Sequence, residues 1–367
     1  MLDFSVSLYL GLKHHSGTLP PYRQLTTGVP AALRQPTKSG TTARALARLV
    51  GCEHGVLGVS TLHLFFDLLT ILSRENVALF VDDGIYPVAR WVVERATGRG
   101  TPLRFFAHGD PWDLHRLVAK HVRARQRPVV FSDGYCPECC RVSPIGEYLE
   151  SIRRFGGLLV VDDTQALGIL GLRPTGSCSW PHSSPYGQGG GGSLRYSGVE
   201  AEDVVVVNSL AKGFGAPIAL CAGNQAVVDR FTRESRTRVH CSPPSITSVL
   251  AAERAMAVNA RRGEQLRHRL AAVVSRFRRR LGAAGIRLAG NLFPVQSLAT
   301  IPGLDLYRLY ERLQEAGVQA VLKRSHRKRR PQLAFLCTAD HTVRQIDQAT
   351  AIIAHTVHAA TRHRRFF

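Results

Sequence analysis

Short apolar runs recur along the first part of the chain, and polar or glycine residues follow each of them. Runs of this kind are typical of strands that are buried on both faces of a sheet. We therefore predict strands at residues 55–59, 77–81, 103–107, 129–131, 158–161 and 204–207. Helical patterns begin at Thr41, at Leu114 and at Ile145. Strands that alternate with helices predict an α/β fold, with a large, mostly parallel sheet and helices on both of its faces.

The first 45 residues lack this alternation. Pro20, Pro21, Pro30 and Pro36 exclude a long helix there, because proline breaks the helical hydrogen-bond pattern. We therefore expect residues 1–45 to form an N-terminal arm.

The pattern changes again beyond Gly223. Helices are predicted at 225–236, 244–281, 304–314 and 341–361, and strands at 295–301, 318–322 and 333–338. We therefore predict a large domain at 46–240, followed at 241–367 by a long connecting helix and a small C-terminal α+β domain.

A lysine follows the strand at 204–207. Lys212 lies beside Ser209 and between small residues that include Gly213 and Gly215. A partly desolvated lysine can have its pKa lowered enough to act as a nucleophilic amine and form a Schiff base. Glycines next to it let the backbone approach a bulky ligand closely. The alternative is an ordinary solvated surface lysine.

Two carboxylates, Asp162 and Asp163, follow the strand at 158–161. Ligands of open α/β sheets bind at the carboxyl ends of the strands, so a carboxylate there can converge with Lys212 on one crevice. A buried carboxylate needs a cationic partner, and the protonated pyridine nitrogen of pyridoxal phosphate is one such partner. The alternative for Asp163 or Thr164 is a helix N-cap.

Four stretches carry a resemblance to a known family. They are 2–12 (LDFSVSLYLGL), 161–165 (VDDTQ), 209–215 (SLAKGFG) and 242–244 (SPP). In the same order they resemble the N-terminal segment, the aspartate segment, the cofactor-lysine segment and a proline-marked helix start of the α-oxoamine synthases. This group of fold-type I pyridoxal phosphate enzymes contains 8-amino-7-oxononanoate synthase. The resemblance implies a fold-type I architecture, pyridoxal 5'-phosphate as the cofactor and a homodimer with its active site at the interface.

The resemblance also implies roles for particular residues. Lys212 is expected to hold the cofactor as a Schiff base and to move the proton at the substrate α-carbon, and Asp162 to keep the pyridine nitrogen protonated. Tyr86 is expected to stack on the cofactor ring, where the family has a histidine, and Gln165 to hydrogen-bond the ring oxygen.

The cofactor phosphate is expected at a helix start. Thr61, Leu62 and Ser209 are the predicted phosphate-binding residues, because the N-terminus of a helix binds anions. His240 or Ser242 is expected to contribute from a second subunit. Without the resemblance, residues 60–63 are equally typical of an ordinary helix cap.

Three pocket positions differ from the family pattern. Ser7 replaces an asparagine, Gln165 replaces a histidine, and Ala334 stands where the family has an arginine for the amino-acid carboxylate. The basic run at 324–330 either supplies a substitute cation or is a solvated loop. The family reaction is the decarboxylative condensation of an amino acid with an acyl thioester. The alternative is an aminotransferase, or another carbon–carbon bond-forming pyridoxal phosphate enzyme of secondary metabolism with a non-standard amine substrate.

The formal net charge of +21 comes mostly from arginine. A nucleic-acid surface is one interpretation, but no recognition motif or aromatic-basic interleaving accompanies the charge, so we expect a solvated basic surface and no nucleic-acid partner. A descendant without cofactor that only binds a ligand is a further alternative, against which the pair of Lys212 and Asp162 argues.

Eight cysteines are spread unevenly over the chain, and no export signal or membrane-spanning run is present. We expect reduced thiols, a cytoplasmic location and no membrane association. Cys136 and Cys139 have the spacing of half a zinc site or of a redox pair. No second ligand pair of suitable spacing follows, and His115 and His121 lie upstream on a helix, so we predict no metal. A glycine-rich loop at 173–199 lacks the ending of a phosphate-binding P-loop and is expected to be a mobile flap over the pocket.

Overall fold

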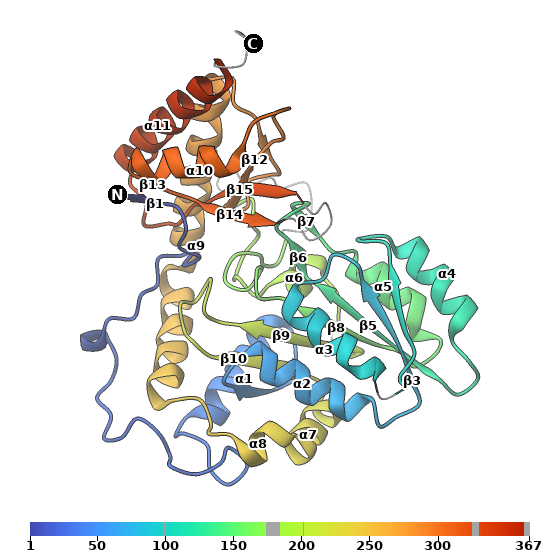
Figure 1. Cartoon of the computed structure of the whole chain (residues 1–367). Coiled ribbons are helices and arrows are strands. Elements are labelled where there is room, and N and C mark those ends of the chain that lie inside the picture. The colour runs from blue at the N-terminus through green and yellow to red at the C-terminus, as the bar shows by residue number, and fades with distance from the viewer. Residues whose placement is uncertain (99, 174–183, 201, 325–329, 363–367) are drawn as a thin grey trace. The chain divides into compact units, whose positions relative to one another are not determined.

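The structure is a computed structural model and describes residues 1–98, 100–173, 184–200, 202–324 and 330–362. The chain divides into two compact units (Figure 1). The larger unit comprises Leu12–Cys136 and Arg141–Gly263. The smaller unit comprises Met1–Gly11, Pro137–Cys140 and Glu264–Phe367.

A seven-stranded sheet forms the centre of the larger unit, with the strand order β2-β10-β9-β8-β5-β3-β4. The strands are β2 (His54–Gly58), β3 (Val77–Asp82), β4 (Leu103–Phe106), β5 (Arg127–Asp133), β8 (Leu158–Asp162), β9 (Val204–Ser209) and β10 (Ala219–Gly223). Strand β10 runs antiparallel to both of its neighbours, β2 and β9, and all other neighbouring strands of this sheet are parallel. The prediction of a mostly parallel sheet in an α/β fold is confirmed, and each predicted strand lies within about a residue or two of its expected place.

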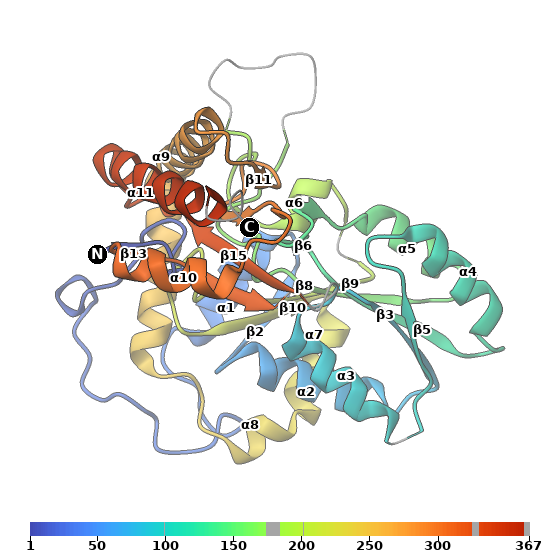
Figure 2. The same cartoon turned by 45° about the horizontal axis from the view of Figure 1, so that its top comes forward.

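Helices cover both faces of this sheet (Figure 2). They are α1 (Ser39–Val50), α2 (Thr61–Leu72), α3 (Pro87–Thr97), α4 (Pro111–His121), α5 (Ile145–Arg153) and α7 (Gln225–Glu234). Alternate side chains of β9 point to opposite faces of the sheet. Val204 and Val206 pack with α1, α4 and α5, whereas Val205 and Val207 pack with α2, α3 and α7. Burial on both faces is the reason that β9 is a continuous apolar run rather than an alternating one.

Apart from short connecting elements, one strand and one helix of the larger unit are absent from the sequence predictions. Strand β10 consists largely of alanine and glycine, which have low strand propensity, and it forms because it pairs with β2 on one side and β9 on the other. Helix α3 begins at Pro87, whose fixed backbone angle suits a first helical position. Helix α4 starts at Pro111, earlier than predicted, because the Asp110 side chain accepts the N–H groups of Trp112 and Asp113.

Shorter elements connect the main ones. They are the antiparallel pair β6 (Tyr135–Cys136) and β7 (Arg141–Val142), and helices α6 (Ser193–Ser197) and α8 (Arg236–His240). The predicted long helix is confirmed as α9 (Ile246–Ala283). Within the described ranges, neither α9 nor any other helix combines the length and the apolar character needed to cross a membrane.

The smaller unit contains an antiparallel sheet with the strand order β11-β12-β15-β14. Its elements are β11 (Leu288–Ala289), β12 (Val295–Leu298), β14 (Val321–Arg324), β15 (Pro331–Leu336), α10 (Leu306–Glu315) and α11 (Val343–Arg362), together with β1 (Leu2–Asp3), which pairs in parallel with β13 (Val318–Gln319). The rings of Phe4, Phe277 and Phe335 pack together in its core. The strands and helices predicted beyond residue 290 are confirmed, although the strand predicted at 318–322 is split between β13 and β14.

Candidate active site

The carboxyl ends of the parallel strands meet at one edge of the large sheet. Four polar residues occupy these ends: Ser60 follows β2, and Asp133, Asp162 and Ser209 close β5, β8 and β9. This edge is where ligands bind in open α/β sheets. The fold therefore gathers residues that are far apart in the sequence.

The segment that carries Lys212 turns directly after β9. The Ser209 hydroxyl accepts the N–H of Ala211 at 3.4 Å, which begins the turn. Gly213 has no space for a side chain, because a Cβ there would lie 2.2 Å from the Leu167 carbonyl oxygen. Gly215 has a φ of +63°, a conformation that glycine adopts without strain. The two glycines thus fix the position of the lysine backbone against the neighbouring turn.

Lys212 faces an aromatic ring. Its Nζ lies 5.5 Å from the centre of the Tyr86 ring, a cation–π contact. Lys212 is half-buried, and Tyr86 is 46% exposed at the start of α3. The structure therefore brings together the two residues that the sequence assigned to the reactive amine and to ring stacking.

Asp162 is buried at the end of β8. Burial raises the pKa of its carboxyl, while hydrogen bonds from Thr164 and the charge of Lys212 oppose that shift. The Thr164 N–H donates to Asp162 Oδ1 at 3.1 Å, and the Thr164 hydroxyl accepts the N–H of Ser209 at 2.9 Å. Thr164 therefore joins the ends of β8 and β9, and it holds the carboxylate within the electrostatic reach of the lysine.

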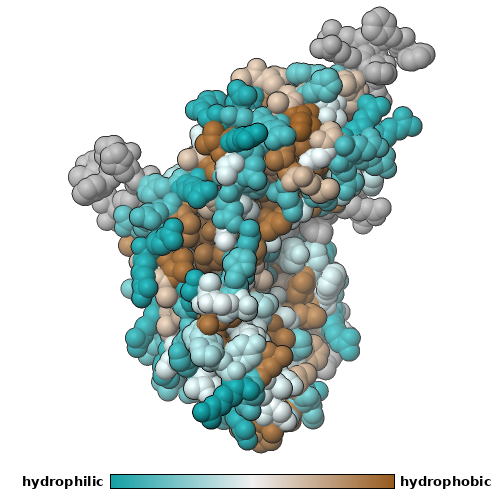
Figure 3. All heavy atoms as spheres, turned by 90° about the vertical axis from the view of Figure 1, so that its left-hand side faces the viewer, coloured by the Kyte–Doolittle hydropathy of each residue, from teal (hydrophilic) through white to brown (hydrophobic). Residues whose placement is uncertain are grey.

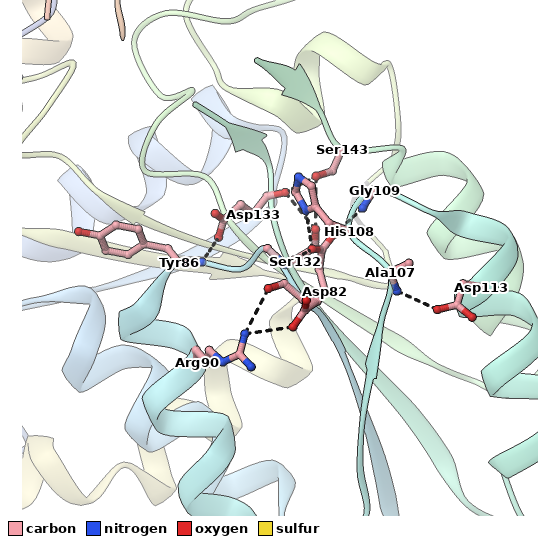
Figure 4. Close-up of polar contacts among 12 residues, drawn as sticks. Asp82, Tyr86, Arg90, Ala107, His108, Gly109, Asp113, Ser132, Asp133 and Ser143 are labelled. Atoms are coloured by element: carbon pink, nitrogen blue, oxygen red, sulfur yellow. Dashed lines mark hydrogen bonds and ion pairs between the residues drawn. The ribbon is translucent and has the colours of Figure 1, made fainter. Parts of the chain in front are cut away.

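Asp133 is a site residue for which the sequence had predicted no role. It lies opposite Asp162 in the β5–β8 ladder, and its Oδ1 accepts the Tyr86 N–H at 3.1 Å (Figure 4). Burial is the main reason that the pKa of the Asp133 carboxyl lies well above its ordinary value, and the negative charge of Asp162 is the second. A carboxylate that directly follows a buried strand was the available signal, as it was for Asp162.

The predicted phosphate site lies at the start of α2. Ser60 caps this helix, and its hydroxyl lies 3.5 Å from the His63 N–H and 2.8 Å from His63 Nδ1. Thr61 is half-buried and Leu62 is 44% exposed, so their backbones lie at the surface of this turn. The first turn of a helix presents N–H groups and the positive end of the helix dipole, which favours an anion.

The remaining predicted cofactor-binding residues are Gln165, His240 and Ser242. Gln165 is half-buried in the turn after β8. His240 is exposed and ends α8, and Ser242 is exposed two residues beyond it. Ser242 lines a cavity of about 20 Å³ together with Val59 and His63, which places it beside the α2 turn in its own chain.

A second polar cluster occupies the same sheet edge and was not predicted. His108 Nδ1 lies 2.6 Å from Asp82 Oδ1 (Figure 4). Asp82 also accepts the N–H groups of Gly84 at 2.7 Å and Gly109 at 3.0 Å, and the Tyr148 hydroxyl at 3.2 Å. The hydrogen bond with Asp82, followed by one with Cys136, raises the pKa of His108 to about 10.

The glycine-rich loop packs against Asp163 instead of leaving the sheet. The Ser193 N–H donates to Asp163 Oδ2 at 2.8 Å, so the carboxylate caps α6, thirty residues further along the chain. A Cβ on Gly192 would lie 1.9 Å from the same oxygen. Burial raises the pKa of Asp163 to about 7. The flap was predicted for a loop whose residues 174–183 lie outside the described ranges.

The other residues that depart from the family pattern belong to the smaller unit. Ser7 is half-buried in the N-terminal segment, and Ala334 is buried in β15 opposite Ser297 and Val321. Residues 325–329, which include most of the predicted cationic run, lie outside the described part of the chain.

Several curated relatives of this chain are 8-amino-7-oxononanoate synthases. The chain is 29% identical to the 8-amino-7-oxononanoate synthase of Alkalilimnicola ehrlichii over 70% of its own length and 62% of that enzyme. It is 25% identical to the 8-amino-7-oxononanoate synthase of Marinobacter nauticus over 96% of its own length and 86% of that enzyme. The chain covers less than two thirds of the Alkalilimnicola enzyme, and it also covers only 64% of the length of the 8-amino-7-oxononanoate synthase from Thioalkalivibrio sulfidiphilus.

Solved structures show the same fold at low identity. Serine palmitoyltransferase from Sphingomonas wittichii superposes with a TM-score of 0.81 at 17% identity, covering 98% of this chain and 88% of that one. The 8-amino-7-oxononanoate synthase of Francisella tularensis gives 0.73 at 17% identity, with 98% and 99% covered. The predicted fold-type I architecture is thereby confirmed. The family model for aminotransferase class I and II matches residues 145–353, which is more than half of the sequence. This chain is a member of the aminotransferase class I and II family.

Proposed function

We propose that the protein is a pyridoxal phosphate-dependent transferase that acts at the α-carbon of an amino-acid-like substrate. The observation that carries this proposal is the grouping of Lys212, Asp162 and Tyr86 at one edge of the sheet. The family membership and the names of the relatives support it.

The residues present fit the cofactor. Asp162 is a buried carboxylate whose pKa is raised by burial, so a cation bound beside it favours its charged form, and a protonated ring nitrogen is such a cation. The exposed face of Tyr86 offers a stacking surface. Thr61 and Leu62, at the start of α2, together with Ser209, are suited to the phosphate. Gln165 is assigned to the ring oxygen, and His240 or Ser242 to a contribution from a second subunit.

Pyridoxal phosphate supplies an electron sink for negative charge that develops at the substrate α-carbon. The chain supplies the positioning and the proton transfers. Lys212 is suited to hold the cofactor covalently and then, as a free amine, to move the proton at the α-carbon. Thr164 and Asp133 orient Asp162 and the Tyr86 backbone, so the two groups that flank the lysine are themselves held by hydrogen bonds.

We favour the decarboxylative condensation of an amino acid with an acyl thioester as the reaction. The name shared by the curated relatives supports this choice. Amino-group transfer is the second candidate, because Ala334, at the position expected for the carboxylate-binding arginine, is a small buried residue. A bidentate arginine is difficult to replace, so the amine substrate of this protein is proposed to differ from that of the relatives.

A homodimer in the cytoplasm completes the proposal. Apolar residues of the N-terminal arm lie at the surface: Tyr22 is 50%, Leu25 54% and Leu33 78% exposed. Patches of hydrophobic side chains lie among hydrophilic ones on the face drawn in Figure 3. Apolar surface of this kind is suited to self-association.

The cofactor assignment is tested with the full-length chain loaded with pyridoxal phosphate. We expect a visible absorption band that borohydride bleaches, after which the cofactor mass is found on the peptide that contains Lys212. Lys212→Ala should lose both signals, because no other amine occupies that turn. Lys120→Ala, which removes an exposed lysine of α4, is the matched control and should keep both. A chain that takes up no cofactor contradicts the proposal.

The reaction is tested by its products. Condensation releases carbon dioxide and the thiol of the acyl thioester in equal amounts, whereas amino-group transfer yields a keto acid and releases neither. We expect a set of amino acids and acyl thioesters to include a pair that gives both carbon dioxide and free thiol. Formation of a keto acid without thiol release would establish the second candidate.

A further inference from the structure

His108 and Cys136 face each other beside the candidate active site, and that site assigns neither of them a role. His108 follows β4 and Cys136 closes β6, so both belong to the larger unit. A ring nitrogen of His108 and the sulfur of Cys136 lie within 4.8 Å of each other. The His108 side chain is 7% exposed and Cys136 is 4% exposed. A nitrogen and a sulfur thus converge in a place with little access to water.

Asp82 fixes the imidazole. The Asp82 carboxylate is hydrogen-bonded to His108 Nδ1 at 2.6 Å (Figure 4). Nε2 is therefore the ring nitrogen of His108 that remains for Cys136. Backbone N–H groups of Gly84 and Gly109 hold the same carboxylate, so it cannot turn away. A histidine that gives one ring nitrogen to a carboxylate and offers the other to a thiolate has the arrangement of a metal ligand with its supporting carboxylate.

The sequence around Cys136 fits the same chemistry. Cys139 and Cys140 follow it in the chain, and Cys-x₂-Cys is the spacing by which one segment supplies thiolates to zinc. The expectation that no metal binds rested on the lack of a second ligand source near this motif. His108, twenty-eight residues upstream, is such a source, and only the fold brings it to Cys136.

We propose that His108 and Cys136 are two ligands of a tetrahedral zinc ion whose other two positions are taken by water, and that Asp82 orients His108 for this role. Zinc prefers imidazole nitrogen and thiolate sulfur, and both ligand atoms are held in place before it binds. On binding, the zinc takes the place of the proton shared by the two side chains, and that proton leaves to solvent. Asp82 ends β3, His108 follows β4 and Cys136 ends β6. The metal would therefore hold these three parts of the larger unit together.

The test uses the full-length chain purified without chelators and without a histidine tag. After exhaustive dialysis we expect stoichiometric zinc by elemental analysis. Replacement of zinc by Co²⁺ should give visible ligand-field bands of tetrahedral type and a near-ultraviolet sulfur-to-cobalt charge-transfer band. The result does not depend on pyridoxal phosphate, so it stands apart from the test of the proposed function. A dialysed chain with neither zinc nor the charge-transfer band overturns the proposal.

Substitutions locate the ligands. Asp82→Asn should weaken zinc binding about 10- to 100-fold, as expected for a supporting carboxylate, and Cys136→Ser should weaken it further. Cys52→Ser is the matched control, because Cys52 is also a buried thiol of the larger unit, and it should retain full affinity. A folded Cys136→Ser chain with unchanged zinc affinity contradicts the proposal.

A measurement without substitution covers the case in which a variant does not fold. In urea below the unfolding transition, where local opening exposes the buried Cys136 thiol, zinc should slow its alkylation by iodoacetamide, read by peptide mass. Cys241, a half-buried thiol of the larger unit, should react at the same rate with and without the metal. Equal alkylation of Cys136 in both conditions would show a thiol that takes no metal.

Discussion

At the scale of single residues, the candidate site depends on carboxylates whose surroundings set their charge. Asp133, Asp162 and Asp163 are all buried near the ends of two adjacent strands. The charge of Lys212 acts on Asp162, whereas at Asp133 and Asp163 the nearby charge of Asp162 adds to the effect of burial. Burial is the largest influence on all three carboxyl groups and raises the pKa of each, but Lys212 opposes the shift at Asp162 alone.

The charge of Asp162 should decide cofactor affinity. We expect Asp162→Asn to weaken pyridoxal phosphate binding by about a hundredfold or more, because losing one partner of a buried pair costs about 3–5 kcal/mol. Equilibrium dialysis measures this affinity directly. Asp83→Asn, at an exposed aspartate of the same sheet edge, is the control and should bind the cofactor as the parent chain does. Equal affinities for the two variants would remove Asp162 from the site.

Asp163 should make stability depend on pH. Its pKa rises from the ordinary 3.8 to about 7 in the folded chain, so between these values the folded state binds more protons than the unfolded one. Stability from this group is therefore present at low pH and is lost as the pH rises towards 7, by up to about 1.4 kcal/mol per pH unit.

Asp163→Asn keeps an acceptor for the Ser193 N–H but cannot titrate. We expect its free energy of unfolding, from urea titrations between about pH 4 and 7, to fall less with pH than that of the parent chain. Parallel pH profiles for the two chains are the result that rejects this assignment.

At the scale of elements, the turn after β9 decides where Lys212 lies. A Cβ on Gly213 would overlap the Leu167 carbonyl oxygen, and that carbonyl belongs to the turn after β8. The two turns can pack this closely only because residue 213 is glycine. The lysine and aspartate turns are therefore a coupled pair.

Gly213→Ala should destabilise the chain by about 1–3 kcal/mol, as overpacking against rigid backbone does, and should also lower the yield of borohydride-fixed cofactor. Urea unfolding and peptide mass mapping measure the two effects. Gly146→Ala is the control, because it lies in α5 and the nearest atom to its Cβ is 3.9 Å away. If both variants behave alike, close packing at residue 213 is not what positions the lysine.

At the scale of the whole molecule, self-association is the property to test. Leu33 is 78% exposed on the N-terminal arm, and a charge in an apolar interface is costly. If the arm takes part in a dimer, Leu33→Glu should shift the sedimentation profile from dimer to monomer. Val343→Glu, at the start of α11, changes a comparably exposed apolar residue and should leave the profile unchanged. A parent chain that sediments as a monomer contradicts the proposed dimer.

The sequence alone determined much of this protein. The buried runs at 158–161 and 204–207 predicted two strands of one large sheet, since short continuous apolar runs are typical of strands that are covered on both faces. Asp162 and Lys212 could be selected because Asp162 directly follows the first run and Lys212 lies five residues after the second. These are local signals, and they required no knowledge of which strands are neighbours.

The tertiary structure decided the rest. Strand β10 forms from weak strand residues because β2 and β9 supply its hydrogen bonds. Asp133 becomes a site residue because β5 pairs with β8. His108 meets Cys136 only because the fold brings the segment after β4 to the segment after β5. The local sequence indicates which residues are buried and which segments are strands or helices. Which side chains meet at the sheet edge depends on the order of the strands, and that order arises from the packing of the whole sheet.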